Sequence, residues 1–340
     1  MKSFVLEAQS TSLDGVKQIE TDLPSPGPGQ VLVKMKAASL NFRDLAIVAG
    51  QYFGGPVQKD TVLLSDGAGE VERAGEGVSR FQSGDRVAGT FFEDLIDGPA
   101  NPMANPALGH SAEGVLTQYR LFHEDNLVSI PDALSFEEGA CLPCAGVTAW
   151  HAVMEAGNPV NADSTVLALG TGGVSMFALQ FAKAAGAKVI ITSSSDDKLA
   201  KAKDLGADEG INYKTHPDWE EEVRNLTAGK GVDCVVEVGG IGTINRSIAS
   251  LGAGGKIGMI GVLAGNEGDC NPRMLMMTGS SIHGIFVGNR SMFERMNQFI
   301  TEHDLHPQID KVFDFDDSVD AIKYFQSQAH MGKVVIRIDG

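Results

Sequence analysis

The sequence predicts an α/β protein in which a doubly wound parallel sheet follows a mostly-β region. From Asp163 onward, short apolar runs alternate with helical patterns, which is typical of a parallel sheet covered by helices on both faces. Residues 1–130 instead contain short strand-like runs separated by Gly, Pro and Asp, as in a small barrel or sandwich. A length of 340 residues also favours two domains, since one domain usually has roughly 150 residues.

Composition excludes several functional classes. Asp and Glu number 44 against 27 Lys and Arg, and the net charge of −17 disfavours nucleic acid and anionic lipid as partners. No apolar run reaches about 18 residues, the length that a membrane span needs, and the first residues lack a secretory pattern. The four cysteines, which suit a reducing compartment, are Cys141, Cys144, Cys234 and Cys270. We therefore expect a cytoplasmic protein that binds neither nucleic acid nor a membrane.

The first region begins with strands at Lys2–Glu7 and Val31–Ala38, the second of which alternates apolar residues on one face. A turn must separate them, because the Pro- and Gly-rich stretch 24–29 lacks backbone donors and has fixed φ angles. The stretch Phe91–His110, with its Gly-Pro and Asn-Pro steps, is expected to be a long surface loop. Shorter strands are expected at Gly69–Glu72, Arg86–Gly89, Thr117–Phe122 and Leu127–Ile130.

The second region alternates strands with helices, as in a Rossmann-type doubly wound domain. The expected strands are Val166–Leu169, Lys188–Thr192, Gly210–Tyr213, Val232–Val238, Lys256–Gly261 and Ser281–Val287. The expected helices are Gly173–Ala185, Asp197–Leu205, Asp218–Thr227 and Thr243–Leu251. Beyond Gly288, the pattern predicts helices over Met292–Ile300 and Ser318–Gln326, and a final strand over Lys333–Ile338.

A glycine-rich turn follows the first strand of this second region. The run Gly170-Thr171-Gly172-Gly173-Val174-Ser175 lies between that strand and an apolar helix, and a second strand comes about 20 residues later. Gly170 permits a tight turn, and Gly172 lets backbone N–H groups approach a pyrophosphate at the helix N-terminus. The alternative is a tight turn without a ligand. The residues expected to bind a dinucleotide are Gly170, Thr171, Gly172, Gly173 and Val174.

The end of the second strand favours NADP over NAD as that dinucleotide. An NAD enzyme usually places an acid there, whereas this strand ends in three serines at 193–195. Asp196 and Asp197 are expected instead as the N-cap and first turn of the next helix. Lys198 could equally be a solvated lysine on a helix face, and NAD stays possible. The expected ligands of the 2′-phosphate are Ser193, Ser194, Lys198 and Tyr213.

Other cofactor contacts are expected where later strands end, because ligands of open α/β sheets bind at the carboxyl edge. Ordinary turns are the alternative explanation for the glycines at these places. A further contact is expected from Lys333, which could reach a phosphate. The contacts expected at the strand ends are Gly239, Gly240, Gly261, Val262, Phe286 and Val287.

Several motifs occur in an order that resembles one family. They are Asn41-Phe42-Arg43-Asp44, Asp66-Gly67-Ala68-Gly69, Gly84-Asp85-Arg86-Val87, Pro143-Cys144-Ala145-Gly146 and the glycine turn. The chain resembles the medium-chain dehydrogenase/reductase superfamily, specifically its zinc-free quinone-oxidoreductase-like and alcohol-dehydrogenase-like members. The resemblance implies a GroES-like catalytic domain over 1–145, a Rossmann domain over 146–288 and a segment 289–340 that rejoins the catalytic domain. It also implies a homodimer joined through strand Ser281–Val287.

The resemblance also bears on metal binding. Relatives with a catalytic zinc use Cys, His and Cys ligands, and the matching positions here hold Asn41, Ser65 and Cys144. One thiolate with an amide and a hydroxyl is a poor zinc site, and the stretch 91–110 contains no cysteine. We therefore expect no metal, with Cys144 as a small packing residue.

Without a metal, hydrogen-bond donors must stabilise the negative charge that develops on a substrate oxygen. Simpler roles are possible, namely an ion pair between Arg43 and Asp44, a turn at Asn41, and a bond from Thr148 to its own helix backbone. The resemblance also implies that Thr148 lies beside the nicotinamide. The residues that the resemblance implies as catalytic are Asn41, Arg43, Asp44, Ser65 and Thr148.

We therefore hypothesise a zinc-independent, NADPH-dependent oxidoreductase that transfers hydride to an enone, a quinone or a related carbonyl compound. Reduction of an activated C=C bond places charge on a carbonyl oxygen, which suits a site made of donors alone. The alternatives are an alcohol or aldehyde dehydrogenase that uses NAD or NADP, and a non-catalytic NADPH-binding sensor or scaffold. Specificity is expected to lie in the loops Gln51–Lys59, Phe91–Asn105 and Leu263–Met277.

Overall fold

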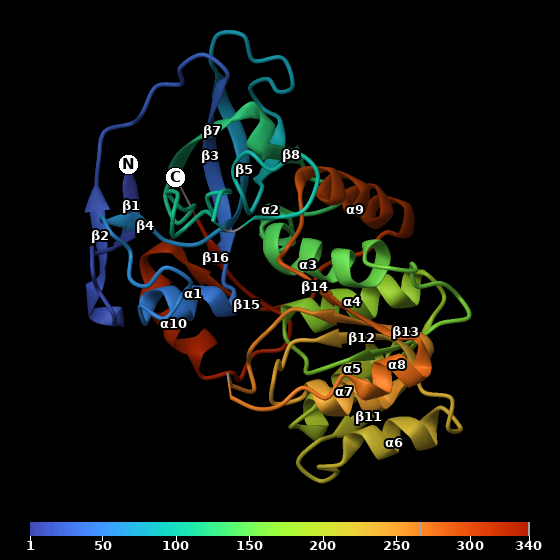
Figure 1. The fold of residues 1–340 in the computed structure, drawn as a ribbon. Helices are drawn as coiled ribbons and strands as arrows, with labels where there is room; N and C mark the ends of the chain where they lie inside the picture. The colour runs from blue at the N-terminus through green and yellow to red at the C-terminus, as the bar shows by residue number, and fades with distance from the viewer. Residues whose placement is uncertain (102, 266, 339–340) are drawn as a thin grey trace. The chain divides into compact units, whose positions relative to one another are not determined.

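The computed structural model describes residues 1–101, 103–265 and 267–338, which form two compact units. Unit 1 combines Met1–Val147 with Val287–Gly340, the blue and red ends of the chain in Figure 1, and unit 2 is Thr148–Phe286. Positions 102 and 266 lie in two of the loops expected to set specificity, and with 339–340 they fall outside the described residues. None of the described helices is long and apolar enough to cross a membrane.

Unit 1 is built on two β-sheets. Strand β3 (Gln30–Ser39) lies within the larger sheet and pairs antiparallel with β5, β7 and β16. The order of this sheet is β15-β16-β3-β5-β6-β8, with β7 also on β3, and the smaller sheet has the order β2-β1-β4. The remaining strands are β1 (Lys2–Leu6), β2 (Val16–Glu20), β4 (Thr61–Val62), β5 (Asp66–Ala74), β6 (Arg86–Gly89), β7 (Tyr119–His123), β8 (Leu127–Ser129), β15 (Ile309–Asp314) and β16 (Lys333–Arg337).

The last strand of the chain lies against β3. Ile336 of β16 pairs with Ala38, and Leu40 donates its N–H to the Val334 carbonyl at 3.0 Å. Because β16 begins at Lys333, this register brings the start of the strand to the turn between β3 and helix α1 (Phe42–Val48). The C-terminal strand therefore borders the turn that carries several of the expected catalytic residues.

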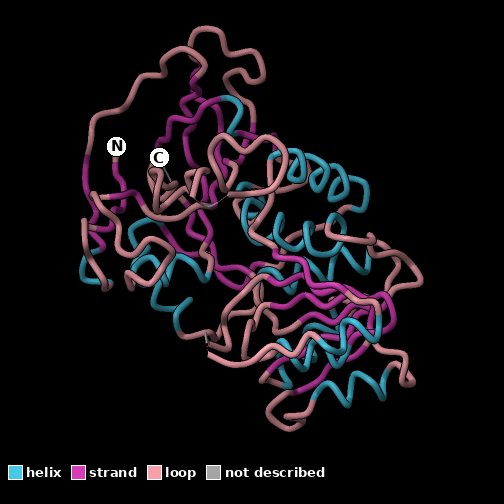
Figure 2. Tube along the Cα trace, viewed as in Figure 1, coloured by secondary structure: helices cyan, strands magenta, loops and turns pink. Residues whose placement is uncertain are grey.

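Unit 2 contains one six-stranded sheet in which all neighbouring strands are parallel. Its order, β11-β10-β9-β12-β13-β14, is the doubly wound order in which the first strand is central (magenta strands in Figure 2). In Figure 1, helix α4 lies on one side of this sheet and α6, α7 and α8 lie on the other. The α/β fold class, a doubly wound parallel sheet with a mostly-β region, is thereby confirmed.

The strands of unit 2 are β9 (Thr165–Ala168), β10 (Lys188–Ser193), β11 (Glu209–Asn212), β12 (Val232–Glu237), β13 (Leu251–Met259) and β14 (Ser281–Gly284). Its helices are α4 (Gly173–Ala184), α5 (Asp196–Asp204), α6 (Trp219–Leu226), α7 (Ile244–Ser250) and α8 (Arg273–Thr278). Helix α3 (Val147–Trp150) spans the boundary between the units, and unit 1 also contains α2 (Phe136–Gly139), α9 (Arg290–His303) and α10 (Ser318–Gln326).

Some elements differ from the sequence-based expectations. Strand β2 is mostly exposed, so its sequence lacks the apolar alternation that indicates a strand. Strand β13 begins at Leu251 rather than Lys256, because the Gly-rich stretch 252–255 has few side chains to indicate that it is a strand. Two π-helical turns, Leu142–Gly146 and His151–Glu155, flank α3, and their wider period does not match the 3.6-residue pattern used to predict helices.

Each unit has its own apolar core. In unit 1, β3 and β16 contribute Val33, Met35 and Ile336, all at most 1% exposed. In unit 2, the fully buried Leu167 and Val235 come from the neighbouring strands β9 and β12. The β16–β3 contact is therefore part of the core of unit 1 and not only an edge pairing.

Truncation of Ile336 to alanine should lower the free energy of unfolding by about 2–5 kcal/mol, because it leaves a cavity beneath the β16–β3 pair. Urea denaturation of the full chain, followed by circular dichroism, measures this shift. The exposed residue Glu72 of β5 provides the control, and Glu72→Ala should change the free energy by less than about 0.5 kcal/mol. Equal effects of the two substitutions would contradict the packing of β16.

Candidate functional site

The glycine turn of unit 2 has open space beside its backbone. Gly170 has a φ of +75°, which favours glycine, and its N–H donates to Thr192 Oγ1 at 3.1 Å. A Cβ atom built on Gly170 or Gly172 would meet no heavy atom within 4 Å. Gly172 has an ordinary φ of −78°, so the protein itself does not require glycine there. The turn therefore has the room that a ligand needs to approach the backbone.

Helix α4 begins at this turn without a side-chain cap. Its N-cap is Gly172, and the bond from Met176 N to Gly172 O, at 3.0 Å, precedes the rest of the helical ladder. The amides of residues 173–175 therefore have no acceptor within the helix. Ser175 uses its hydroxyl to donate to the Leu169 carbonyl at 2.6 Å, which holds the helix close to the strand. Such a helix start suits a phosphate, since its N–H groups and dipole favour an anion.

The ends of β10 and β11 bring other expected cofactor residues to one edge of the sheet. Ser193 pairs with Asn212 in the parallel ladder, and Tyr213 N donates to the Ser193 carbonyl at 3.0 Å. Ser193 is buried, Ser194 and Lys198 are partly buried, and the Tyr213 side chain is exposed. The structure thus places these four residues on adjacent segments at one sheet edge.

The acidic residues near this edge have other roles. Asp196 Oδ1 accepts a hydrogen bond of 2.7 Å from Asn212 Nδ2. The N-cap of α5 is Ser195, whose hydroxyl accepts from Lys198 N, so the expectation of Asp196 as the N-cap is wrong. Asp196 and Asp197 lie in the first turn of α5, where a negative charge stabilises the helix dipole.

The glycines that follow β12 and β13 are needed for packing within the protein. A Cβ atom on Gly261 would lie 2.1 Å from the Val238 carbonyl oxygen, and one on Gly239 would lie 2.2 Å from Thr243 Oγ1. Gly240 has a φ of +89°. These constraints explain the three glycines without any ligand. Cofactor contacts of Gly239, Gly240, Gly261 and the half-exposed Val262 stay predictions.

Glu237, at the end of β12, is a residue that sequence interpretation missed. Its Oε1 accepts from Gly239 N at 2.7 Å, Gly240 N at 3.0 Å and Thr243 Oγ1 at 2.7 Å. Its other oxygen accepts from the Ser247 hydroxyl, and the side chain is fully buried. The carboxylate therefore organises the turn after β12. An acid at the end of an otherwise apolar strand was the signal that could have identified it.

Three residues that were expected to contact the cofactor lie where the chain passes from one unit to the other. Thr148 is buried in α3 and is the first residue of unit 2. Phe286 is the last residue of unit 2, whereas Val287 belongs to unit 1, so the expected pair is divided between the units. Val287 has a φ of +53°, an unfavourable conformation for a β-branched residue. Such strain persists only where the surrounding structure holds it in place.

A buried polar cluster lies in unit 1 where β3 ends and α1 begins. Asn41 N donates to Asp44 Oδ2 at 2.7 Å, and Arg43 Nη1 lies 3.4 Å from Asp44 Oδ1. Arg43 Nη1 also donates to the Leu108 carbonyl at 2.9 Å. The three side chains at positions 41, 43 and 44 are at most 9% exposed. The structure brings Asn41, Arg43 and Asp44 together, and the ion pair foreseen as the simpler alternative is present.

The Arg43 guanidinium and the Asn41 amide have unused donors. The guanidinium carbon lies 4.8 Å from the Tyr52 ring centroid and 4.7 Å from that of Phe91. Arg43 Nε and Nη2 and Asn41 Nδ2 are buried and make no hydrogen bond of ordinary geometry to the described residues, although Arg43 interacts more loosely with Tyr52 and Asn41 with Asp66. Buried donors without partners are unfavourable and therefore rare in folded proteins. These three nitrogen atoms are thus candidates for binding an oxygen atom of a ligand.

Ser65 and Asp66 form a second part of this cluster. The Ser65 hydroxyl donates to Asp66 Oδ1 at 2.6 Å, so its proton is already used within the protein. Asp66 Oδ2 accepts from the backbone N–H of Cys144 at 3.0 Å. Ser65 and Asp66 are fully buried. Asp66 follows Ser65 at the start of a Gly-rich buried strand; the motif Asp66-Gly67-Ala68-Gly69 supported the family resemblance, but the sequence interpretation assigned no role to this acid.

Lys333 makes its contacts within this cluster. Its ammonium donates to Asn41 Oδ1 at 2.7 Å and to the Leu40 carbonyl at 2.8 Å, and lies 3.9 Å from Asp66 Oδ2. The residue is 2% exposed. The expected phosphate contact of Lys333 stays a prediction, and in this arrangement the ammonium faces oxygen atoms of unit 1.

Burial sets the protonation of the acids and thiol in the cluster. Burial raises the pKa of Asp44 to about 6, and the Arg43 charge opposes the rise. Burial also raises the pKa of Asp66, opposed by Lys333 and by hydrogen bonding from Ser65 and Asn41. Burial and the Asp66 charge raise the pKa of the Cys144 thiol, which keeps it protonated at neutral pH.

This donor set does not fit zinc. The only soft ligand at the three matched positions is Cys144, whereas the other two positions hold an amide and a hydroxyl, and the hydroxyl of Ser65 already donates to Asp66. The Asn41 oxygen already accepts from an ammonium, and a second cation at that oxygen would be repelled by it. Within the ranges that the structure describes, no cluster of three His, Cys, Asp or Glu side chains could hold a metal ion.

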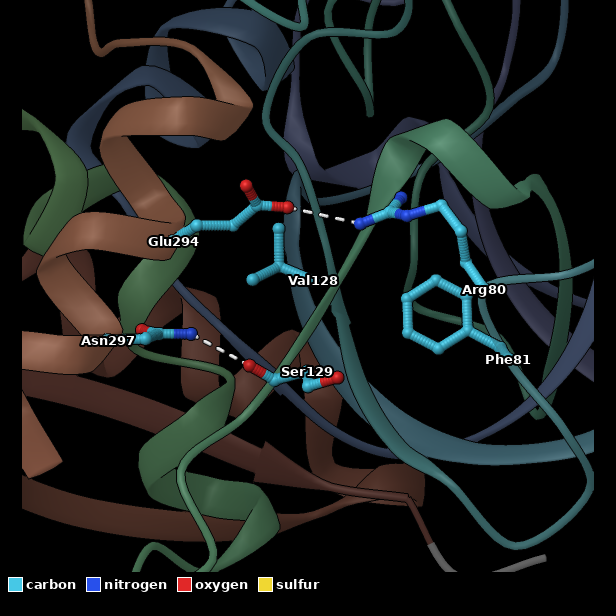
Figure 3. A pocket seen from close by; sticks show the side chains of 6 residues that line it. All are labelled: Arg80, Phe81, Val128, Ser129, Glu294 and Asn297. Atoms are coloured by element: carbon cyan, nitrogen blue, oxygen red, sulfur yellow. Dashed lines mark hydrogen bonds and ion pairs between the residues drawn. The ribbon is translucent and has the colours of Figure 1, made fainter.

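A separate pocket of unit 1 does not contain the expected site residues. It is lined by Arg80, Phe81, Val128, Ser129, Glu294 and Asn297 (Figure 3). Arg80 Nη2 pairs with Glu294 at 3.1 Å, and Asn297 Nδ2 donates to the Ser129 carbonyl at 2.8 Å. These bonds join α9 to β8 and the loop before β6, so we assign this pocket a structural role.

Two family models match the chain. Residues 27–132 match the alcohol dehydrogenase GroES-like domain, and residues 173–302 match zinc-binding dehydrogenase. A zinc-type alcohol dehydrogenase-like protein of Schizosaccharomyces pombe is 46% identical over 99% of both chains. A quinone oxidoreductase of Pseudomonas aeruginosa is 31% identical over 75% of this chain and 72% of its own. The solved structure of a putative alcohol dehydrogenase from Sinorhizobium meliloti has a TM-score of 0.90, with 37% identity over 99% of both chains.

Gly172→Ala should separate ligand binding from folding. Alanine suits a φ of −78° and meets no neighbour, so the free energy of unfolding should stay within about 1 kcal/mol of wild type. The added methyl occupies the space beside the turn and should weaken binding of NADPH by about tenfold or more, measured by fluorescence titration. Gly261→Ala is the control, and its clash with Val238 should lower stability. Unchanged NADPH binding by the Gly172 variant would rule out the turn as a phosphate site.

Asp44 should make stability depend on pH. Its folded pKa of about 6 exceeds the ordinary value of 3.8, so the folded state binds more protons than the unfolded state between about pH 4 and 6. The stability from this group should thus be greatest below pH 4 and fall as pH rises to 6. Calorimetry should show that the Tm of Asp44→Asn rises relative to the Tm of wild type as the pH increases from 4 to 7. The exposed Asp132→Asn controls for loss of a carboxylate, and a pH-independent difference at Asp44 would contradict this account.

Proposed function

Because the chain belongs to the medium-chain dehydrogenase/reductase superfamily, and so is an oxidoreductase of that family, we propose that it is a zinc-independent, NADPH-dependent reductase of enones, quinones or related carbonyl compounds. The single observation that carries this proposal is the polar cluster of unit 1. It contains buried nitrogen donors of Asn41 and Arg43 that make no hydrogen bond of ordinary geometry to the described residues, and an amide, a hydroxyl and one cysteine at the three matched positions are a poor donor set for zinc. Such a cluster suits a reaction in which negative charge develops on an oxygen atom.

Unit 2 supports the cofactor part of the proposal. The open turn at Gly170 and Gly172 and the uncapped start of α4 fit the pyrophosphate of a dinucleotide. Thr192 would hold the turn through its bond to Gly170 N, and Glu237 would hold the turn after β12. When bound, a nicotinamide cofactor supplies the hydride. In this proposal Thr148 packs beside the nicotinamide.

The preference for NADPH rests on the edge formed by β10 and β11. An acid that binds the ribose 2′-OH would repel a 2′-phosphate, and no acid stands at the end of β10. The first acid beyond it, Asp196, is engaged with Asn212. Hydroxyl groups of Ser193, Ser194 and Tyr213, with the Lys198 ammonium, would hold the phosphate.

The reaction that suits this cluster is reduction of a C=C bond conjugated to a carbonyl group. Addition of hydride to the β-carbon moves the π electrons onto the carbonyl oxygen as an enolate, and water then supplies a proton to the α-carbon. Asn41 Nδ2 and Arg43 would donate hydrogen bonds to that oxygen, and one such donor in a dry site contributes on the order of 3 kcal/mol. The reaction needs no further acid from the protein.

Ser65 and Asp44 act indirectly in this proposal. The Ser65 proton is donated to Asp66, so Ser65 would position that carboxylate rather than donate to substrate. Asp44 accepts from Asn41 N and pairs with Arg43, so it would hold the two donor residues at the start of α1. Both were expected as catalytic residues, and both become positioning residues here.

A second candidate function is an alcohol or aldehyde dehydrogenase. It is favoured by the names of the relatives, since the 46% identical protein is called zinc-type alcohol dehydrogenase-like. In that reaction hydride adds to the carbonyl carbon itself, and the alkoxide oxygen must be protonated. A third candidate is an NADPH-binding sensor or scaffold, which would bind the cofactor but turn over no substrate.

The remaining proposals concern partners and location. We propose a homodimer that pairs through β14, because this strand is an edge of the sheet of unit 2 and its side chains are partly exposed. A net charge of −17 favours small-molecule substrates over nucleic acid and anionic lipid. We also propose a cytoplasmic location, in keeping with free cysteines at 141, 144, 234 and 270.

Purified protein should oxidise NADPH when supplied with conjugated enones or quinones, followed by absorbance at 340 nm. We expect kcat/KM for NADPH to exceed that for NADH by at least about tenfold, and activity to survive a metal chelator. Gly172→Ala should lose activity through its cofactor affinity. Faster turnover of alcohols with NAD would favour the second candidate, and tight NADPH binding without turnover of any acceptor would favour the third.

A further inference from the structure

We propose that Lys333 is a positioning residue that fixes the orientation of the Asn41 amide, so that Asn41 Nδ2 is directed to a ligand oxygen. This inference rests on the proposed function, and it assigns to Lys333 a role other than phosphate binding. Lys333 belongs to β16 and Asn41 to the turn after β3, so the contact joins the two chain segments that make up unit 1.

The ammonium of Lys333 faces three oxygen atoms and makes hydrogen bonds to two of them. It donates to the Leu40 carbonyl at 2.8 Å and to Asn41 Oδ1 at 2.7 Å. Asp66 Oδ2, at 3.9 Å, supplies the compensating negative charge. A cation that is 2% exposed needs such partners, because burial without them is strongly unfavourable.

The chemistry of the ammonium determines which way the amide faces. A lysine ammonium only donates hydrogen bonds, so the atom of Asn41 that faces it must be the oxygen. The NH2 group of Asn41 must then face away from Lys333. That group is buried and makes no hydrogen bond of ordinary geometry to a described residue, although a looser interaction with the Asp66 carboxylate lowers the pKa of that acid. The protein therefore holds the NH2 group in a fixed direction and leaves at least one of its N–H bonds to another partner.

The charge of Lys333 also strengthens the donor. Hydrogen bonds from charged groups are shorter and stronger than neutral ones, and the bond from Lys333 to Asn41 Oδ1 is of this kind. A bond to the amide oxygen polarises the amide and makes its N–H groups better donors, as in other hydrogen-bond chains. Lys333 thus improves the donor that faces a developing negative charge.

The carboxylate that balances Lys333 is held by a strained backbone. Leu64, two residues before Asp66, has a φ of +68°, which is unusual for a bulky residue. The Leu64 and Leu63 carbonyls both accept from Val115 N, at 3.0 Å, which holds the segment in this conformation. Strain of this type persists only where the surrounding structure holds it in place. The backbone just before Asp66 is therefore fixed by its neighbours.

The phosphate role and the positioning role differ in their kinetic effects. A lysine that binds a cofactor phosphate acts on cofactor affinity, whereas a lysine that orients Asn41 acts on the chemical step. Lys333→Met should therefore lower kcat for 2-cyclohexen-1-one by about 10- to 100-fold and leave the Kd for NADPH within about twofold of wild type. Lys333→Arg should restore part of kcat, and Asn41→Asp, which keeps an acceptor for Lys333 but lacks the NH2 group, should lose at least as much as Lys333→Met.

Two further variants control for folding. Lys256 is also buried and also donates to two backbone carbonyls, Val153 at 3.0 Å and Ala156 at 2.6 Å, but it lies in unit 2. Lys256→Met should therefore lower Tm without a comparable loss of kcat. Because Lys333→Met leaves Asp66 buried and unpaired, the double variant Lys333→Met/Asp66→Asn removes both charges and should fold. Its kcat should remain low.

A side-chain NMR experiment separates this inference from the proposed function. In wild type with NADP+, addition of cyclohexanone should shift the 15N and 1H signals of the Asn41 NH2 group, and in the double variant it should not. If no acceptor is reduced by wild type, the proposed function fails, but this measurement still decides the orientation of Asn41. The inference is overturned by wild-type kcat in a folded Lys333 variant, by a raised NADPH Kd with unchanged kcat, or by unshifted Asn41 signals in wild type.

Discussion

A lysine ammonium removed from water must be surrounded by oxygen atoms, and in unit 1 this requirement connects the last strand of the chain to the turn after β3. Lys333 meets it with the Leu40 carbonyl, the Asn41 amide oxygen and the Asp66 carboxylate. Removing one member would leave a buried charge or an unpaired polar atom, which is strongly unfavourable. The orientation of Asn41 depends on this contact, which also joins β16 to the turn in addition to the pairing of β16 with β3.

In unit 2 the main constraint is the space beside the glycines, which is empty at some positions and occupied by protein atoms at others. At Gly170 and Gly172 a side chain would enter empty space, whereas at Gly239 and Gly261 it would collide with protein atoms. Glycines at the ends of strands in one sheet therefore have different causes. The first pair leaves room for a ligand, whereas Gly261 packs against the Val238 backbone and Gly239 against Thr243, next to the buried Glu237 that holds the turn after β12.

The fold could be predicted to a large extent because its signals are local. The alternation of short apolar strands with helices is a property of neighbouring residues, and it indicated all six strands of the parallel sheet, although β13 begins earlier than expected. The signals were weak where a strand is exposed, as in β2, or where the helical period is wider, as in Leu142–Gly146. The Ser195 cap of α5 was missed because two acids follow it directly and serve equally well as caps.

The sequence by itself determined the doubly wound sheet, the glycine turn before α4 and the residues that stand at the zinc-ligand positions of relatives. These depend on residue type and short spacings, which local sterics and apolar periodicity translate directly into structure. Only the tertiary structure decided that Lys333 bonds to Asn41 and that Ser65 donates to Asp66. Residues far apart in the chain come together only when the strands pair. Their burial, which no local sequence pattern specifies, then determines their protonation state and their hydrogen bonds.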